Sequence, residues 1–213
     1  RDSKTMKEYL THVAEGLKEE FSHFADADDD QLEWHPDIDY VIDHIATVFS
    51  RSPRSDMEFK DSTNINVRKA VSIGRFVQEP LAEVAYMWGG AADISANIRG
   101  EEALFLDLHP LYQQVNKSFL VKFLERELII AINEAGVNLN AAIHNIHRHA
   151  QLSFVCGLGK IKAHDMISKI KRLGGIVRRK VDLREKAILG RVVFANAAGF
   201  LRIRDVPSAH LNP

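Results

Sequence analysis

The sequence is poor in cysteine and in long apolar runs. Its 213 residues contain one cysteine, Cys156, which excludes an internal disulfide and a zinc site built from several cysteines. A single thiol fits a reducing compartment such as the cytosol or the nucleus. No apolar run reaches the ~18 residues needed to span a membrane, and no charged-then-apolar leader opens the chain. Because the first residue is Arg1, we expect a piece of a longer protein.

Motifs of several common enzyme classes are also missing. The chain has no GxSxG nucleophile elbow, no Walker loop and no GxGxxG dinucleotide fingerprint. Four aspartates occupy the five positions Asp26–Asp30, but a metal site would need further ligands from elsewhere, so we interpret this run as a solvated loop. We therefore expect no enzymatic activity, no cofactor and no bound metal.

Charge is distributed unevenly along the chain. The net charge is only −1, but residues 1–40 contain twelve acidic and four basic side chains, a local balance of −8. Residues 160–191 contain eleven basic and three acidic side chains, a local balance of +8. The basic segment is where a polyanion would bind, and two solvated faces are the alternative interpretation.

Helical spacing of apolar residues dominates the first half. We predict one strand, at 38–42, and a turn or loop at 52–55, where proline follows serine. Thr5 and Glu8 offer a capping box for the first helix, and Pro80 suits the first turn of another. The predicted helices cover about residues 6–24, a short stretch through 49, 67–77 and 80–88.

The second half is predicted to consist of helices joined by glycine turns. Gly136 suits the end of the first helix, and Asn138 or Asn140 can cap the next. We place a domain boundary near Asp107, after a glycine- and alanine-rich connector. The predicted helices cover about residues 118–135, 140–155, 160–172, 181–187 and 191–198.

The most informative motif is the sequence GLGKIKA at residues 157–163. Gly157 can adopt the positive φ that ends a helix, Leu158 can insert into the core, and Gly159 leaves the backbone open to close approach. The next helix then begins with free N–H groups and the positive end of its dipole, which together bind phosphate. Lys160 and Lys162 add positive charge beside these groups.

A second, weaker copy of this motif follows. Gly190 and Arg191 precede another short apolar helix, so this hairpin keeps one glycine. Paired hairpins could hold both strands of a duplex without reading its sequence. We also include Arg178, Arg179 and Lys180 among the candidate nucleic-acid contacts, because they lie in the basic segment between the two hairpins.

These motifs resemble those of the Tex family of transcription proteins. The sequences VCGLG at 155–159 and AAGFLRI at 197–203 resemble its tandem helix-hairpin-helix domain. Upstream, AVSIGR at 70–75 and QEPLAE at 78–83 resemble the end of its YqgF-like domain, and NEAGVNLN at 133–140 resembles the linking segment. LHPL at 108–111 and SPRS at 52–55 favour the eukaryotic branch, the suppressor-of-Ty (Spt-six) elongation factors and histone chaperones.

The resemblance covers roughly residues 35–205 and implies a mainly α fold. It predicts a partial α/β ribonuclease-H-like (YqgF-like) domain at 1–106, an all-helical tandem helix-hairpin-helix domain at 107–205, and a tail at 206–213. It also implies a nuclear location, with RNA polymerase II and histones as partners of the full-length protein. The sequence departs from the family pattern in having KIK at 160–162 for the usual Pro-Arg-Lys, and Glu79 where aspartate is common.

Other candidate sites have simpler explanations. Glu79 and Glu83 share a helical face, which we interpret as a solvated helix start. His144, His147 and His149 form a cluster in the sequence, and His144 and His147 share a predicted helix face and could in principle bind a metal. No cysteine or carboxylate at ligand spacing joins them, so a polar helix face is the better interpretation. We interpret Cys156 as a small buried residue.

Three functions remain open at this stage. We predict sequence-independent binding of the DNA or RNA backbone through residues 157–191. The alternatives are a nuclease of the ribonuclease-H-like fold, whose leading aspartate would lie outside this chain, and a scaffold whose hairpins are purely structural. No membrane partner is expected.

Overall fold

A computed structural model describes residues 2–22, 38, 40–59, 64–89, 102–106 and 109–204. It divides into two units, Arg1–Ile42 and Asp43–Pro213. Within the described part, no helix is both long and apolar enough to cross a bilayer. The predicted run Asp26–Asp30 and the tail 206–213 lie outside the described residues.

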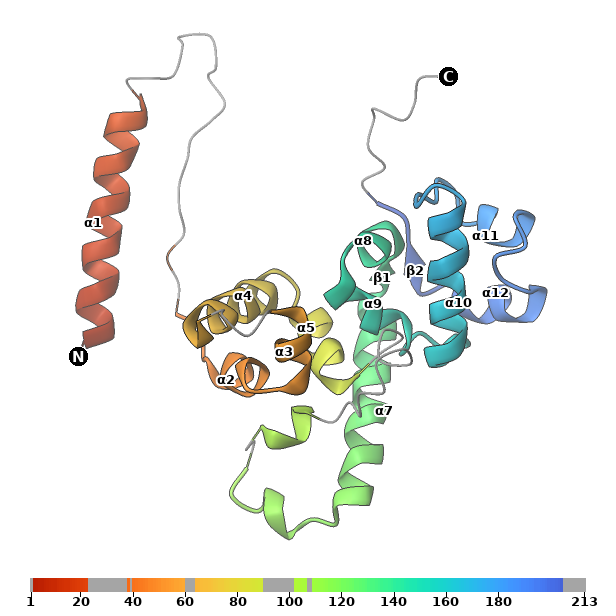
Figure 1. Ribbon diagram of the computed structural model, residues 1–213, viewed down its shortest axis with the longest axis horizontal. Helices are drawn as coiled ribbons and strands as arrows, with labels where there is room; N and C mark the ends of the chain where they lie inside the picture. Colours follow the sequence, from red (N-terminus) through yellow and green to blue (C-terminus); the bar gives the residue numbers. More distant parts are fainter. Residues whose placement is uncertain are drawn as a thin grey trace. The chain divides into compact units, whose positions relative to one another are not determined.

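The first unit contains one long helix, α1 (Asp2–Ser22) (Figure 1). This confirms the predicted first helix, but the capping box is wrong, because the helix already begins at Asp2 and Thr5 lies inside it. The predicted strand at 38–42 is also wrong, since none of its described residues is in a strand. The strands among the described residues are 137–138 and 201–202, which pair with each other, and a strand needs a hydrogen-bonded neighbour to satisfy its backbone.

The second unit is built mainly from short helices. Figure 1 shows α2 to α5 gathered together, α8 to α12 grouped on the other side of α5, and α7 ending beside α5 and α9. The elements of this unit are α2 (His44–Ser50), α3 (Pro53–Glu58), α4 (Ile65–Gln78), α5 (Pro80–Trp88), η1 (Glu102–Phe105), η2 (Tyr112–Gln114), α7 (Lys117–Ala135), β1 (Val137–Asn138), α8 (Leu139–His144), α9 (Ile146–Leu152), α10 (Gly159–Arg172), α11 (Asp182–Glu185), α12 (Arg191–Ala197) and β2 (Leu201–Arg202).

Local sequence explains several of these boundaries. Pro80 occupies the first turn of α5, as predicted. Gly136 ends α7 with a φ of 70°, also as predicted. The turn predicted at 52–55 is instead the start of α3, because Ser52 caps the helix by accepting a hydrogen bond from the N–H of Ser55 at 3.2 Å. The proline that suggested a turn is Pro53, in the first turn of the helix.

One hydrophobic core runs through the second unit. Helix α5 packs against α4, α7 and α9. The buried cluster extends from Phe49 in α2 to Leu201 in β2, and it includes Leu158 of the first hairpin. The helices before and after residue 107 therefore share a core, and the boundary near Asp107 stays a prediction.

The region after α7 is not entirely helical. The predicted helix at 140–155 is two helices, α8 and α9, because Asn145 adopts an extended conformation and its amide donates to the Ala141 carbonyl at 3.1 Å. Asparagine often interrupts helices in this way, since its side chain competes for backbone groups. Strands β1 and β2 then pair in parallel, with Val137 opposite Leu201. This pairing corrects the all-helical prediction.

Candidate nucleic-acid interface

The first hairpin joins α9 to α10 through a tight turn. Gly157 and Gly159 have φ angles of 87° and 69°, a region that side chains rarely adopt. Leu158 is 4% exposed, and its N–H donates to the Val155 carbonyl at 3.0 Å. The predicted turn with a buried leucine between two glycines is therefore confirmed.

The two glycines of this turn have different surroundings. A Cβ atom on Gly157 would lie 2.8 Å from the Cβ of Asn196 in α12, so this glycine allows the hairpin to pack against the second helix-hairpin-helix unit. A Cβ atom on Gly159 would meet nothing within 4 Å. Gly157 therefore faces the protein, and Gly159 faces open space from which a ligand could approach.

Helix α10 begins at the exposed side of this turn. It has 14 residues, and no side chain of the described residues caps its first N–H groups. Lys160 is exposed, and no carboxylate of the described residues pairs with it. The Lys162 ammonium lies 3.4 Å from the Gly157 carbonyl, beside the turn. Open amides, a helix dipole and two lysines form a geometry that can bind a phosphate group.

The second hairpin is built differently. Leu189 is 6% exposed and its N–H donates to the Leu183 carbonyl at 2.8 Å, so it plays the part that Leu158 plays in the first hairpin. The positive φ here falls on Ala187, at 52°, and Gly190 has an ordinary extended conformation. This unit thus lacks the paired positive-φ glycines of the first hairpin. Arg191 is exposed at the start of α12.

The basic run at 178–180 is partly engaged within the protein. The Arg179 guanidinium lies 2.9 Å from the carboxylate of Asp182 and 3.2 Å from that of Glu185. The Lys180 ammonium donates to the Ala198 carbonyl at 3.1 Å. Arg178 is exposed. The charge of Arg179 is therefore largely offset by its two carboxylate partners, which the sequence pattern alone did not indicate.

Two asparagines hold the segments next to the hairpins. The Asn133 side chain accepts from the Cys156 N–H at 2.9 Å and donates to the Phe154 carbonyl at 2.9 Å. Asn140 makes the same pair of bonds with the backbone of Val177, both at 3.0 Å. Neither role is visible in the sequence, because the partners lie 21 to 37 residues away along the chain.

The structure corrects the interpretation of two carboxylates. Glu83 is fully buried, accepts from the Ser72 hydroxyl at 2.6 Å, and has its pKa raised to about 7 by burial. It therefore does not belong to a solvated helix start. Glu79 lies 3.1 Å from the Arg148 guanidinium and accepts from the Gln151 amide at 2.7 Å, so it links α5 to α9.

The histidines and the cysteine also differ from expectation. His144 ends α8 whereas His147 and His149 lie in α9, so His144 and His147 do not share one helix face. Burial lowers the pKa of His147 to about 4. In the part of the chain that the structure describes, no three potential metal ligands lie together. Cys156 is exposed at the hairpin, which corrects its predicted burial.

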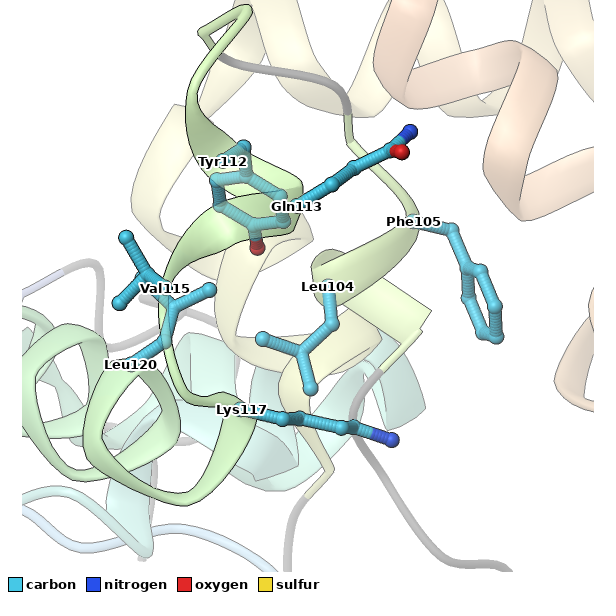
Figure 2. A pocket seen from close by; sticks show the side chains of 7 residues that line it. All are labelled: Leu104, Phe105, Tyr112, Gln113, Val115, Lys117 and Leu120. Carbon is cyan, nitrogen blue, oxygen red and sulfur yellow. The ribbon is translucent and has the colours of Figure 1, made fainter.

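A cavity of about 400 Å³ lies away from the hairpins, among η1, η2 and the start of α7 (Figure 2). Its lining is largely apolar, and Lys117 contributes its one charged side chain. Its lining contains no carboxylate, histidine, serine or cysteine. The lining residues are Leu104, Phe105, Tyr112, Gln113, Val115, Lys117 and Leu120.

Comparisons with known proteins place the chain in a family. A protein family described as "Helix-hairpin-helix motif" matches residues 101–204. The suppressor of Ty 6 homolog of Caenorhabditis briggsae is 34% identical over 77% of this chain and 10% of its own length. The chain belongs to the suppressor of Ty 6 family. The transcription elongation factor SPT6 homolog of Arabidopsis thaliana is 35% identical over 78% of this chain and 9% of its own length.

These matches confirm the predicted resemblance to the eukaryotic branch over 77 to 79% of the chain. Transcription elongation factor SPT6 of Candida glabrata is 31% identical over 79% of this chain and 11% of its own length. The chain thus spans about a tenth of the length of these relatives. Their names describe elongation factors and not enzymes. The predicted site residues stay predictions, because these comparisons do not test individual positions.

Proposed function

We propose that this chain is a nucleic-acid-binding part of a transcription elongation factor and histone chaperone. The first hairpin would bind the phosphate backbone of DNA or RNA through the amides of Gly159 and Lys160. The observation that carries the proposal is the uncapped start of α10 beside an open glycine. Backbone amides and lysines contact phosphate and not base edges, so binding would be independent of sequence.

The predicted contact residues would contribute unequally. Lys160, Lys162 and Arg191 would supply charge at the two hairpins, with Arg178 nearby. Arg179 would contribute less, because the carboxylates of Asp182 and Glu185 already offset its charge. The ammonium of Lys180, like that of Lys162, donates to a backbone carbonyl and keeps its charge. The remaining predicted residues would shape the turns and not contact phosphate through side chains: Gly157, Leu158 and Gly190.

The wider setting is also a proposal. In the full-length protein, this part would act in the nucleus alongside regions that bind RNA polymerase II and histones. We infer that residues 107–205 form the tandem helix-hairpin-helix domain and 206–213 a tail. Residues 1–106 would be the end of a YqgF-like domain that has lost nuclease chemistry. Support for these points comes from the sequence resemblance and from the names of the relatives.

A salt-dependent titration tests the binding proposal. We expect single- and double-stranded DNA and RNA to bind with a Kd of about 10⁻⁴ to 10⁻⁶ M at physiological salt, with little effect of sequence. The variant K160E/K162E should weaken binding to every sequence alike and flatten the salt slope by about two. Fluorescence anisotropy at several salt concentrations measures both quantities.

A matched variant controls for net charge. K122E/R126E reverses two exposed charges on α7 and changes the net charge by the same amount. It should bind nearly as well as the parent. If K160E/K162E also binds like the parent, the hairpin is structural, and a protein-interaction scaffold becomes the better description.

A further inference from the structure

The turn that precedes Gly157 has backbone groups that neither adjoining helix can satisfy. Helix α9 ends at Leu152 and α10 begins at Gly159, so residues 153–158 lie outside both. The side chain of Asn133, in the last turns of α7, meets two of these groups. It accepts from the Cys156 N–H and donates to the Phe154 carbonyl, both at 2.9 Å.

The Asn133 side chain is itself held in place. Its amide nitrogen also donates to the Ile129 carbonyl at 2.6 Å, one turn earlier in the same helix. The oxygen and the amide nitrogen of Asn133 thus both have hydrogen-bond partners, and these bonds fix the side-chain rotamer. Only an amide side chain carries both the acceptor and the donors that this arrangement requires.

We propose that Asn133 is a positioning residue for the phosphate contact of the first hairpin. It fixes the backbone at 154–156, and that segment leads directly into Gly157 and the open amides at the start of α10. This inference rests on the proposed nucleic-acid binding. Pre-organised donors bind more tightly than mobile ones, because a mobile turn must lose conformational entropy when the ligand arrives.

Asn140 provides the matched control. It makes the same two backbone bonds, but to Val177, in the segment after α10. Removing either side chain leaves two backbone groups without a partner, and both variants should lose stability. Only the loss of Asn133 should loosen the first hairpin.

The experiment compares Asn133→Leu with Asn140→Leu in the whole chain. Leucine is close to asparagine in size and favours helices, so it removes the hydrogen bonds with little change in volume. Hydrogen exchange followed by NMR, without nucleic acid, should show the Cys156 amide losing protection in Asn133→Leu and not in Asn140→Leu. Binding of a DNA duplex is then measured by anisotropy and corrected for the folded fraction.

We expect Asn133→Leu to weaken duplex binding about tenfold, the factor that 1.4 kcal/mol represents. The salt slope should stay the same, because Lys160 and Lys162 remain. Asn140→Leu should bind within about twofold of the parent, and Asn133→Gln, which keeps both hydrogen-bonding groups, should recover part of the loss. If Asn133→Leu does not fold, Asn133→Ser is compared with Asn140→Ser in its place, because serine cannot supply the acceptor and both donors together.

The outcomes separate this inference from the proposed function. If the parent binds and the folded Asn133 variants bind equally well, the positioning role is wrong and nucleic-acid binding stands. An equal loss in Asn140→Leu would also overturn the inference, because any loosening of the fold would then explain it. If the parent binds no nucleic acid at all, the proposed function fails, and the positioning role fails with it.

Discussion

Replacing Gly157 with alanine should damage the first hairpin for two separable reasons. Its φ of 87° is a conformation that costs a residue with a side chain about 1–2 kcal/mol. The added Cβ would also lie 2.8 Å from the Cβ of Asn196, and overpacking of this kind costs about 1–3 kcal/mol. We therefore expect Gly157→Ala to lower the free energy of unfolding by about 2–5 kcal/mol.

Two controls divide this cost into its parts. Gly159→Ala places a side chain at a φ of 69° with nothing within 4 Å, so it should show only the conformational cost. Asn196→Gly removes the atom that Gly157→Ala would contact. In the Asn196→Gly background, Gly157→Ala should therefore destabilise the chain less, because the overpacking is gone. The double-mutant cycle isolates this contribution.

Urea denaturation followed by circular dichroism measures these free energies, with the m-value checking that the unfolding transition is unchanged. The reasoning is refuted if Gly157→Ala and Gly159→Ala are equally destabilising. It is also refuted if the cost of Gly157→Ala is the same with and without Asn196. Either result would mean that the hairpin does not pack closely against α12.

Three further predictions concern charge. Glu83 has a folded pKa of about 7 against an unfolded value of about 4.3, so the free energy of unfolding should fall as pH rises between these values. Glu83→Gln should remove that pH dependence and stabilise the chain by about 3 kcal/mol at pH 8. Urea denaturation across pH measures this effect. Arg191→Gln should weaken duplex binding more than Arg179→Gln, because Arg179 already pairs with Asp182 and Glu185, and equal losses in anisotropy would contradict this. Calorimetry with Mg²⁺, Mn²⁺ and Zn²⁺ should detect no micromolar binding, since the described residues bring no three potential ligands together.

Helices with strong apolar periodicity and clear end residues could be predicted from the sequence. Helices α4, α5, α7 and α10 all lie within a few residues of their expected positions, and glycine or proline marks most of their ends. The first hairpin was equally predictable, because a glycine–apolar–glycine sequence between two helices leaves few backbone conformations. These features depend on neighbours within about one turn of the chain, and local sequence therefore determines them.

Features that depend on distant partners could not be predicted in this way. Glu83 resembles a first-turn carboxylate in the sequence, yet α4 covers it and supplies the Ser72 hydroxyl. Val137 and Leu201 pair across two short strands that have no recognisable pattern of their own. The run 38–42 shows the opposite error, because its sequence favours a strand but none of its described residues lies in one. Burial and pairing of this kind are decided by tertiary packing, which overrides local preference.

The two hairpins depend on one another through α7 and the segment that follows it. The helix that carries Asn133 ends at Gly136, and the next residue donates its N–H to the Phe200 carbonyl at 2.8 Å, just after α12. Gly157 packs against Asn196 in α12 itself. Helix α12 and the residues just after it therefore contact both the turn of the first hairpin and the end of the helix that holds that turn. Under the proposed function, the second hairpin, which has one glycine, would therefore contribute to phosphate binding indirectly, by supporting the first hairpin.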